Sequence, residues 1–224
     1  MVQFDYLSQW EDNYNSGKEI NLYPFSDLVS SYFHSQKLLP TFSEKSLRAL
    51  DIGCGCGNNL WFLAEQGMDV IGVDVSPTAI KYAEKIMKDR NVKGEAIVST
   101  FQNFSGQIES FDLIIDRACL THNPIDFVEC VDKVFNLLKS GGLFYTWVFD
   151  WDHGLRKTGT QITPNGFTNF KKKSYWNNLH TFFLSSHELK EFYGAFKIIE
   201  KTKTIQRLDN TDVIAYWSLM LQKI

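Results

Sequence analysis

The 224-residue sequence has only four cysteines and five prolines, and it contains no run of 18 consecutive apolar residues. Without such a run, the sequence offers no candidate transmembrane helix. Its first residues, MVQFDYLSQWEDNYNSG, lack the basic and then apolar regions of a signal peptide. We therefore expect a cytoplasmic protein with no membrane partner, whose four cysteines are free thiols instead of disulfide partners: Cys54, Cys56, Cys119 and Cys130.

An excess of positive charge is also missing. The 23 Lys and Arg residues are outnumbered by 26 Asp and Glu residues, and the formal net charge is -3. A protein that binds nucleic acid usually carries a basic face, so we do not expect nucleic acid as the main partner. Aromatic residues, in contrast, are abundant at 15% of the chain. This abundance predicts a well-filled core and a pocket lined by aromatic side chains.

From residue 46 onward, short apolar runs alternate with helix-like segments. The expected strands are LRALDIG (47–53), DVIGVDVS (69–76), GEAIVST (94–100), FDLIIDRACL (111–120) and LFYTWVFD (143–150). The expected helices are NLWFLAEQG (59–67), PTAIKYAEKIMKDR (77–90) and PIDFVECVDKVFNLLKSGG (124–142), the last with a Gly-Gly stop. Alternation of this kind, with nearly continuous apolar strands, is typical of an α/β fold with a parallel sheet and helices on both faces.

The flanking segments differ from this pattern. Residues 1–45 form an N-terminal extension with helical pieces, including FSDLVSSYFHSQKLL (25–39), which Pro40 follows. Residues 150–180 are rich in Gly, Asn, Thr and Lys, and we expect them to be irregular. A helix with Ser186 as its N-cap is expected over 185–196, and two final strands should form an antiparallel C-terminal hairpin.

The stretch LDIGCGCG (50–57) places three glycines between an apolar strand and a helix. Cys54 and Cys56 have no second Cys or His pair at zinc-site spacing, so no metal is expected. A P-loop would need a lysine that is missing here, and the Gly-x-Gly-x-Gly spacing differs from the dinucleotide pattern. Asp74 ends the next strand, 23 residues after Asp51. A carboxylate in that place can accept hydrogen bonds from both hydroxyls of a ribose, which indicates a nucleoside-bearing cofactor.

Four segments together resemble the motifs of the class I S-adenosylmethionine-dependent methyltransferases. They are LDIGCGCG, VIGVDVS, FDLIIDR and LLKSGGLFY, and the resemblance covers roughly residues 46–150. It implies a Rossmann-like, mostly parallel seven-stranded sheet whose last strand is antiparallel. It also implies S-adenosyl-L-methionine as the cofactor and S-adenosyl-L-homocysteine as the product, in a methyltransferase domain that spans residues 46–224.

The resemblance also assigns residues to the cofactor. Asp51, Gly53, Cys54 and Gly55 would line its amino-acid end, and Asp74 would hold the ribose hydroxyls. The remaining assignments place Val75 on the adenine, Thr100 and Phe101 near the adenine at the end of the third strand, and Asp116 facing the methyl-donor region. An acidic residue that the family often shows near the adenine amine is missing after Ser99.

The N-terminal extension has a looser resemblance. WEDNYNSGKEINLYP (10–24) and DRACLTHNP (116–124) resemble segments of the thiopurine-methyltransferase-like and tellurite-resistance-like branches. That likeness implies that residues 1–45 form a helical lid, in which Tyr6, Trp10 and Tyr14 cover the cofactor. Aromatic faces near a sulfonium would add cation–π attraction. The other interpretation is that these rings only fasten the N-terminus to the domain.

The acceptor side is expected to use His122 as a base and Arg117 to bind a phosphate or carboxylate. His153 is the second candidate for the base, and an ion pair of Arg117 with Asp116 or Asp150 is the other interpretation of the arginine. Residues 150–180 would form the acceptor-binding insertion, whose polar residues include Arg156, Lys157, Lys171 to Lys173, Trp151, Tyr175 and Trp176. We therefore expect methylation of O or N on a small, polar, anionic acceptor, such as a phosphorylated amino alcohol or a nucleotide-linked sugar.

Other functions remain as alternatives. A nucleic-acid methyltransferase often carries an Asn-Pro-Pro-Tyr-like motif, whereas Asn123-Pro124 is followed by Ile125 and Asp126. Protein substrates stay open. A NAD-dependent dehydrogenase would need a second βαβαβ half, where this sequence has a hairpin. A non-catalytic module with this fold would be expected to have a degraded loop and no acid at position 74.

Overall fold

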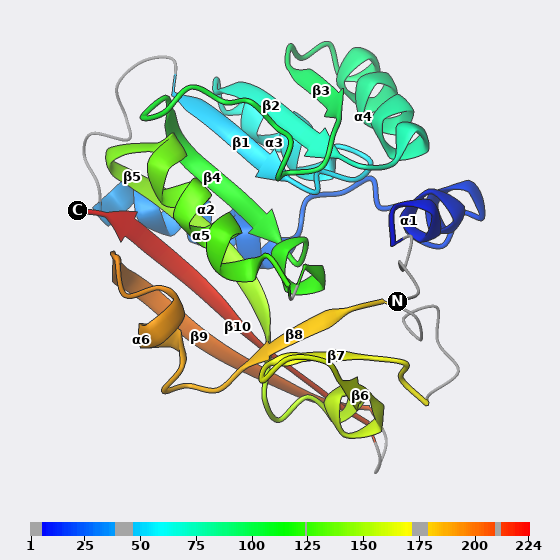
Figure 1. Ribbon diagram of the computed structural model, residues 1–224. Helices are drawn as coiled ribbons and strands as arrows, with labels where there is room; N and C mark the ends of the chain where they lie inside the picture. Colours follow the sequence, from blue (N-terminus) through cyan, green and yellow to red (C-terminus); the bar gives the residue numbers. More distant parts are fainter. Residues whose placement is uncertain (1–5, 39–46, 124, 172–178, 209–211) are drawn as a thin grey trace.

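The computed structural model describes residues 6–38, 47–123, 125–171, 179–208 and 212–224 (Figure 1). The helices are α1 (Tyr6–Asn15), α2 (Ser26–Leu38), α3 (Asn58–Glu65), α4 (Pro77–Asp89), α5 (Phe127–Leu137) and α6 (Leu189–Phe192), with two 3-10 turns, η2 (Leu120–His122) and η3 (Gly154–Thr158). The strands are β1 (Arg48–Ile52), β2 (Asp69–Asp74), β3 (Glu95–Val98), β4 (Phe111–Arg117), β5 (Leu138–Asp150), β6 (Thr160–Gln161), β7 (Gly166–Thr168), β8 (Thr181–Leu184), β9 (Phe196–Leu208) and β10 (Asp212–Lys223).

The main sheet runs in the order β3-β2-β1-β4-β5-β10-β9. The first five strands of this row are parallel to one another, whereas β10 is antiparallel to both β5 and β9. This row confirms the predicted Rossmann-like sheet, mostly parallel, with an antiparallel C-terminal hairpin. Ligands of open α/β sheets bind outside the carboxyl ends of the parallel strands, so the topology places the site at that edge.

The segment between β5 and α6, which was expected to be irregular, carries additional strands. β8 pairs in parallel with β5 at Phe149 and Asp150, and β7 and β6 follow as antiparallel neighbours. Phe149 also pairs with Tyr216 of β10, so β8 must take the other edge of β5, which is the edge of β4. These short strands therefore continue the sheet past the end of β4 (Figure 1). They are too short to show the two-residue periodicity from which a strand is predicted.

Two helix boundaries also differ from the prediction. Helix α5 ends at Leu137, because β5 begins at Leu138 and contains the Gly-Gly pair that was expected to stop the helix. Helix α6 spans only four residues, and Glu188 takes the N-cap position predicted for Ser186. The carboxylate of Glu188 accepts hydrogen bonds from the Asn165 side chain (2.9 Å) and the Ser185 backbone (2.8 Å). One local and one tertiary contact thus fix the start of the helix.

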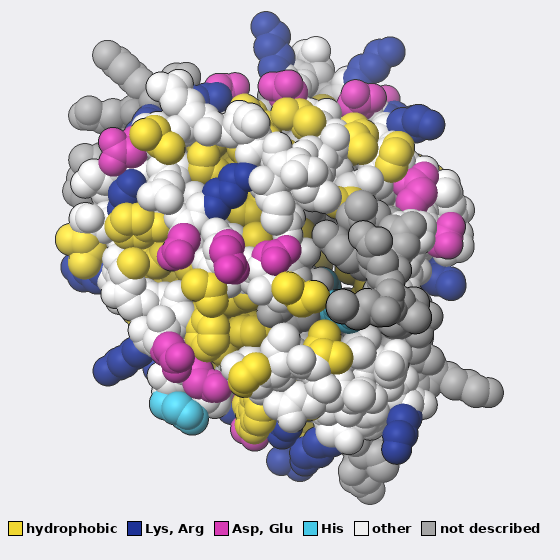
Figure 2. Space-filling view, viewed as in Figure 1, with side chains coloured by type: hydrophobic (Ala, Val, Ile, Leu, Met, Phe, Trp, Pro, Cys, Tyr) yellow, Lys and Arg dark blue, Asp and Glu magenta, His cyan; other side chains and the backbone are white. Residues whose placement is uncertain are grey.

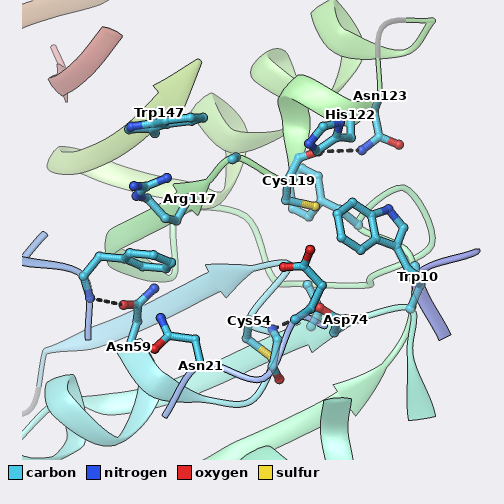
Figure 3. Close-up of a pocket in the computed structure, with 18 of the residues that line it drawn as sticks. Trp10, Asn21, Cys54, Asn59, Asp74, Arg117, Cys119, His122, Asn123 and Trp147 are labelled. Atoms are coloured by element: carbon cyan, nitrogen blue, oxygen red, sulfur yellow. Dashed lines mark hydrogen bonds between the residues drawn. The ribbon is translucent and has the colours of Figure 1, made fainter. Parts of the chain in front are cut away.

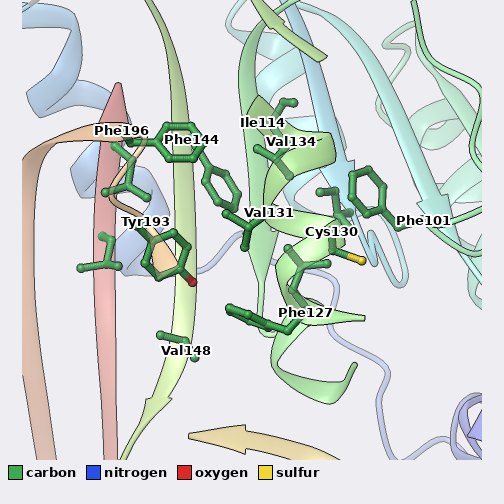
Figure 4. Close-up of a cluster of buried hydrophobic side chains, with 14 of the residues drawn as sticks. Phe101, Ile114, Phe127, Cys130, Val131, Val134, Phe144, Val148, Tyr193 and Phe196 are labelled. Atoms are coloured by element: carbon green, nitrogen blue, oxygen red, sulfur yellow. The ribbon is translucent and has the colours of Figure 1, made fainter. Parts of the chain in front are cut away.

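Each face of the sheet carries its own hydrophobic cluster. Leu50, Ile52 and Ile114 pack with α5 and α6 (Figure 4), whereas Leu113 and Ile115 pack with α2, α3 and α4. The two sets alternate along each strand because successive side chains point to opposite faces. The same alternation sends neighbouring residues at the end of β4 in opposite directions, which decides their roles in the site.

Candidate active site

A cavity of about 690 Å³ opens at the carboxyl ends of β1, β2, β4 and β5, and α1 contributes to its wall. Of the residues predicted for the site, eleven line it: Trp10, Tyr14, Gly53, Cys54, Gly55, Asp74, Val75, Thr100, Phe101, Arg117 and His122. Figure 3 shows how side chains from α1, the glycine loop and the end of β4 converge there. The topology thus brings together most of the residues that the sequence analysis selected.

The backbone of the glycine loop requires glycine at positions 53 and 55. Gly53 and Gly55 have φ angles of +69° and +52°, in the left-handed region that favours glycine. A Cβ atom on Gly53 would lie 2.5 Å from Cβ of Cys119, and one on Gly55 would lie 2.7 Å from Oη of Tyr14. The thiol of Cys54 lies against β2, where burial raises its pKa well above the usual range. This cysteine therefore presents its backbone, and not a thiolate, to the cavity.

Asp74 is held rigidly beside this loop. Its Oδ2 accepts a hydrogen bond from the Gly55 N–H (3.0 Å), and its Oδ1 accepts one from the Ser76 N–H (2.9 Å). The side chain is buried, and burial raises the pKa of the carboxyl to about 6, against the lowering effect of these N–H donors. Each carboxylate oxygen has a second lone pair. The site thus presents an oriented acceptor for two further donors.

The next wall comes from the end of β3. Thr100 and Phe101 line the cavity, but their polar groups also hold the turn. The Thr100 hydroxyl accepts a hydrogen bond from the Asn103 N–H (3.1 Å), and the Phe101 carbonyl accepts one from the Lys133 ammonium (2.7 Å). Two amide side chains that the sequence analysis did not select, Gln102 and Asn123, also line this part. They add polar groups to this wall of the cavity.

Asp51 and Asp116 were predicted to line the site, yet neither is among the cavity-lining residues. The carboxylate of Asp116 accepts hydrogen bonds from the N–H groups of Cys119 (2.8 Å) and Leu120 (2.9 Å) and from the Thr146 hydroxyl (2.8 Å). It therefore holds the turn after β4 and does not face the cavity. Asp51 is fully buried beneath the loop, and burial raises its carboxyl pKa well above the usual range.

Helix α1 brings Trp10 and Tyr14, one helical turn apart, to the cavity. The Trp10 ring meets the His122 ring edge-to-face, with centroids 5.5 Å apart, and Tyr14 is buried against the loop. Tyr6 begins this helix, but its side chain lies outside the described part of the structure. The helix thus supplies two of the three aromatic side chains expected over the site.

Helix α1 is fastened to α4 by Glu11, which the sequence analysis did not select. Its carboxylate accepts hydrogen bonds from the Ser76 hydroxyl (2.5 Å), the Thr78 N–H (3.1 Å) and the Thr78 hydroxyl (2.6 Å). These donors stand at the first turn of α4, where a negative charge is favoured. They lower the pKa of Glu11 to about 2. Only the folded structure reveals this contact, which spans more than 60 residues of sequence.

His122 and His153 both line the cavity, but their hydrogen bonds assign them opposite tautomers. Nδ1 of His122 lies 3.0 Å from the His180 carbonyl oxygen, which can only accept, so Nδ1 carries the proton and Nε2 the lone pair. Nδ1 of His153 accepts a hydrogen bond from the Leu155 N–H (3.0 Å), so its Nε2 carries the proton. Burial lowers the pKa of His122 to about 4, which keeps the ring neutral. His122 can therefore accept a proton at Nε2, whereas His153 can donate one.

Arg117 points to the other face of β4 from Asp116. Its guanidinium carbon lies 4.2 Å from the ring centroids of both Phe25 and Trp147, and its Nε lies 3.4 Å from Oδ2 of Asp27. The ion pair expected with Asp116 or Asp150 is thus replaced by one with Asp27 in α2. Helix α2, which precedes the sheet in sequence, positions this cation at the edge of the cavity.

The far end of the cavity is mostly apolar, in contrast to the polar insertion that the sequence predicted. Trp147 and Phe149 of β5 line it together with Leu155, Val213 and Ile214. Arg156 instead stacks on the Trp151 ring at 4.0 Å and donates to the Trp151 carbonyl (2.6 Å).

Lys157 and Lys171 do not line the cavity, and Lys172, Lys173, Tyr175 and Trp176 lie outside the described residues. Trp147 and Phe149 are two residues apart in β5, so they point to the same face of the strand. The sequence analysis did not use this pattern to predict the wall.

Residues 49–142 match a family model that is described as a methyltransferase domain. The chain is 33% identical over 101 residues to a ubiquinone biosynthesis O-methyltransferase of Chelativorans sp. (strain BNC1), a match that covers 45% of the chain and 40% of that protein. The chain spans about half the length, or less, of several such curated relatives.

Solved structures show the same fold. An S-adenosylmethionine-dependent methyltransferase from Methanosarcina mazei superposes with a TM-score of 0.69 at 22% identity, over 84% of this chain and 97% of that one. The 1,6-didemethyltoxoflavin-N1-methyltransferase of Burkholderia thailandensis, solved with 1,6-didemethyltoxoflavin and S-adenosylhomocysteine, gives 0.64 at 17% identity, over 97% and 87% of the two chains. None of the helices in the described ranges combines the length and hydrophobicity of a membrane span.

Proposed function

We propose that this protein, whose residues 49–142 match the family model of a methyltransferase domain, transfers a methyl group from S-adenosylmethionine to O or N of a small molecule. One observation carries the proposal: the left-handed glycine loop and the oriented carboxylate of Asp74 face the same cavity as His122. A nucleoside-bearing ligand bound to the glycine loop and Asp74 would bring its reactive end toward His122.

The residues present fit the cofactor. Gly53 and Gly55 line the cavity with backbone atoms alone, and Asp74 can accept both ribose hydroxyls. Val75 and Phe101 line the same cavity and would flank the adenine. When bound, the cofactor supplies a methyl group made electrophilic by its sulfonium. Residues 1–45 would act as the lid, in which Trp10 offers an aromatic face to that positive charge.

The acceptor side of the proposal rests on His122. The acceptor O–H or N–H would give its proton to Nε2 of His122 as the acceptor atom bonds to the methyl carbon and the carbon–sulfur bond leaves its electron pair on sulfur. The hydrogen bond from Nδ1 to the His180 carbonyl keeps the lone pair on Nε2 throughout. The protein otherwise aligns the reactants and excludes water, which is the main requirement when the donor is already activated.

The nature of the acceptor has mixed support. One relative is named as an O-methyltransferase and one structural neighbour as an N1-methyltransferase, so either atom fits. Arg117 supports a negatively charged group on the acceptor, as the sequence suggested. A phosphorylated amino alcohol or a nucleotide-linked sugar, however, would set a hydrophilic body against Trp147, Phe149 and Leu155. We therefore propose an acceptor that carries a negatively charged group but whose body is not hydrophilic.

Nucleic-acid methylation has less support. Acidic and basic side chains are interspersed on the face shown in Figure 2, and Arg117 is the one Lys or Arg among the described residues that line the cavity. A strand of nucleic acid would need several cations along its backbone. A protein segment as acceptor remains the second alternative, although no observation favours it.

The test is calorimetric and mass-spectrometric. We expect the purified chain to bind S-adenosylhomocysteine and to be stabilised by it against thermal unfolding, because a ligand that binds only the folded state adds its binding free energy to stability. NAD serves as the matched nucleotide control and should change nothing. Stabilisation by NAD alone, without binding of S-adenosylhomocysteine, would overturn the proposal in favour of a dehydrogenase.

A further inference from the structure

We propose that the methyl acceptor is a flat aromatic ring that carries an acidic O–H or N–H, and that the ring lies at the apolar end of the cavity against a wall formed by Trp147, Phe149 and His122. This inference rests on the proposed function, because it names the substrate class of the same site. It is argued from the side chains of that end and from the hydrogen bonds of His122.

The walls of that end are mostly rings. The ring centroids of Trp147 and Phe149 are 4.8 Å apart at 71°, and those of Phe149 and His153 are 4.7 Å apart at 79°. The His122 ring stands at 72° to the Phe149 ring and at 62° to the Trp10 ring. Aromatic rings prefer such edge-to-face and offset contacts, so a wall of crossed rings favours a planar guest.

The charged side chains nearby are already occupied by other partners. Lys203 forms ion pairs with Asp150 (2.8 Å) and Asp152 (3.0 Å), on a face that does not line the cavity. Arg156 is stacked on Trp151. Arg117, the one charged side chain among the described residues of the apolar end, is itself paired with Asp27 (3.4 Å). A hydrophilic acceptor would lose its hydration there without gaining hydrogen bonds in return, which is unfavourable.

The base also selects the acceptor. His122 is neutral and has the Nε2 lone pair required of a base, but burial makes it a weaker base than an exposed histidine. A phenol, with a pKa of about 10, gives up its proton to such a base far more readily than an alcohol, whose pKa is closer to that of water at about 16. An acidic ring hydroxyl or ring N–H therefore matches both the walls and the base.

The experiment compares matched probes on the whole chain. The probes are 3,4-dihydroxybenzoate, 4-hydroxyquinoline, the ring-saturated 3,4-dihydroxycyclohexanecarboxylate and phosphoethanolamine. Binding to the complex with S-adenosylhomocysteine is measured by saturation-transfer NMR, and methyl transfer is measured by mass spectrometry with labelled S-adenosylmethionine. We expect the aromatic probes to bind in the millimolar range or tighter, with the saturated and phosphorylated probes at least about tenfold weaker.

Two variants locate the binding. Leu155→Lys places a charge in the apolar end and should weaken the aromatic probes at least about tenfold, while S-adenosylhomocysteine binds as before. Ile162→Lys makes the same change in the same insertion on a side chain that is 41% exposed and does not line the cavity, so it should leave the aromatic probes unaffected.

Three results would overturn the inference while the proposed function stands: S-adenosylhomocysteine binds but no aromatic probe does, the saturated or phosphorylated probe is preferred, or Leu155→Lys and Ile162→Lys behave alike. If the wild-type chain does not bind S-adenosylhomocysteine, the proposed function itself is refuted.

Discussion

The two ends of the cavity are built in different ways. The proposed cofactor end uses backbone groups and one carboxylate from short stretches near Gly53 and Asp74, fixed by backbone hydrogen bonds from Gly53 and Cys54 to Val73 (2.8 and 3.0 Å). The proposed acceptor end uses side chains from distant elements, from Arg117 in β4 to Ile214 in β10. A common ligand can be bound by a constant backbone shape, whereas side chains on separate elements can change with the acceptor. Each prediction below tests this division.

The largest effect is expected at the glycine loop. Gly55→Val forces a left-handed φ of +52° on a β-branched residue and brings its Cβ to 2.7 Å from the Tyr14 hydroxyl. We expect binding of S-adenosylhomocysteine by calorimetry to fall at least about 100-fold, with a stability loss of about 1–2 kcal/mol from the backbone strain. Gly67→Val is the control, since φ is +85° there with nothing within 4 Å of the new Cβ. It should lose stability and keep affinity, and equal affinity losses in both variants would contradict the prediction.

The next effect belongs to the acceptor end. His122→Gln removes the proposed base, and kcat should fall by about 10²–10⁴ while the dissociation constant of S-adenosylhomocysteine stays unchanged. His153→Gln removes the ring whose tautomer can only donate at Nε2, so its kcat loss should be clearly smaller. Turnover assays on an acceptor found in the probe set would measure both variants. If the two histidine variants exchange rank, His153 is the base.

A smaller loss is expected when the carboxylate of the cofactor end is removed. Asp74→Ala deletes the proposed ribose contacts, at about 1.5–3 kcal/mol each as an upper bound, so affinity for S-adenosylmethionine should fall at least about tenfold. Asp116→Ala is the comparison, because its carboxylate holds a turn outside the cavity. That variant should lose stability by thermal unfolding before it loses affinity. An unchanged dissociation constant for Asp74→Ala would end the ribose assignment.

The lid should respond more weakly. Glu11→Gln removes the charge that fastens α1 to the first turn of α4, and we expect cofactor affinity and turnover to fall by about 3–10-fold with the stability of the sheet domain retained. Asp12→Asn makes the same change on the neighbouring exposed residue. Calorimetry should show no loss for it. Full activity of Glu11→Gln would mean that α1 does not act as a lid.

The last expected effect concerns stability instead of binding or turnover, and it is a pH dependence. Asp74 and Asp116 have folded pKa values of about 6, above the ordinary 3.8, so the folded state binds more protons than the unfolded chain. Their stabilisation is fully present below about pH 4 and is lost as pH rises through about 6, on the order of 2–3 kcal/mol each. Urea unfolding of Asp74→Asn between pH 4 and 7 should show a flatter dependence than the wild type. An identical slope would show that Asp74 does not titrate in this range.

Much of the cofactor end could be predicted from the sequence, because its signals are local. Three alternating glycines after an apolar strand, and an acid at the end of the next strand, specify a loop and a carboxylate whatever the rest of the chain does. Strand alternation was equally readable, although it was not applied to the end of β4. It places Asp116 and Arg117 on opposite faces of β4.

The acceptor end and the lid were decided by tertiary structure. The pairing of Arg117 with Asp27, the fastening of α1 by Glu11 and the tautomer of His122 all depend on partners that no spacing in the sequence relates. The sequence by itself determined the sheet, the glycine loop and the acid beside it, since these follow from periodicity and backbone conformation. Only folding decided which side chains face the acceptor, because contacts between distant elements are set by how the elements pack.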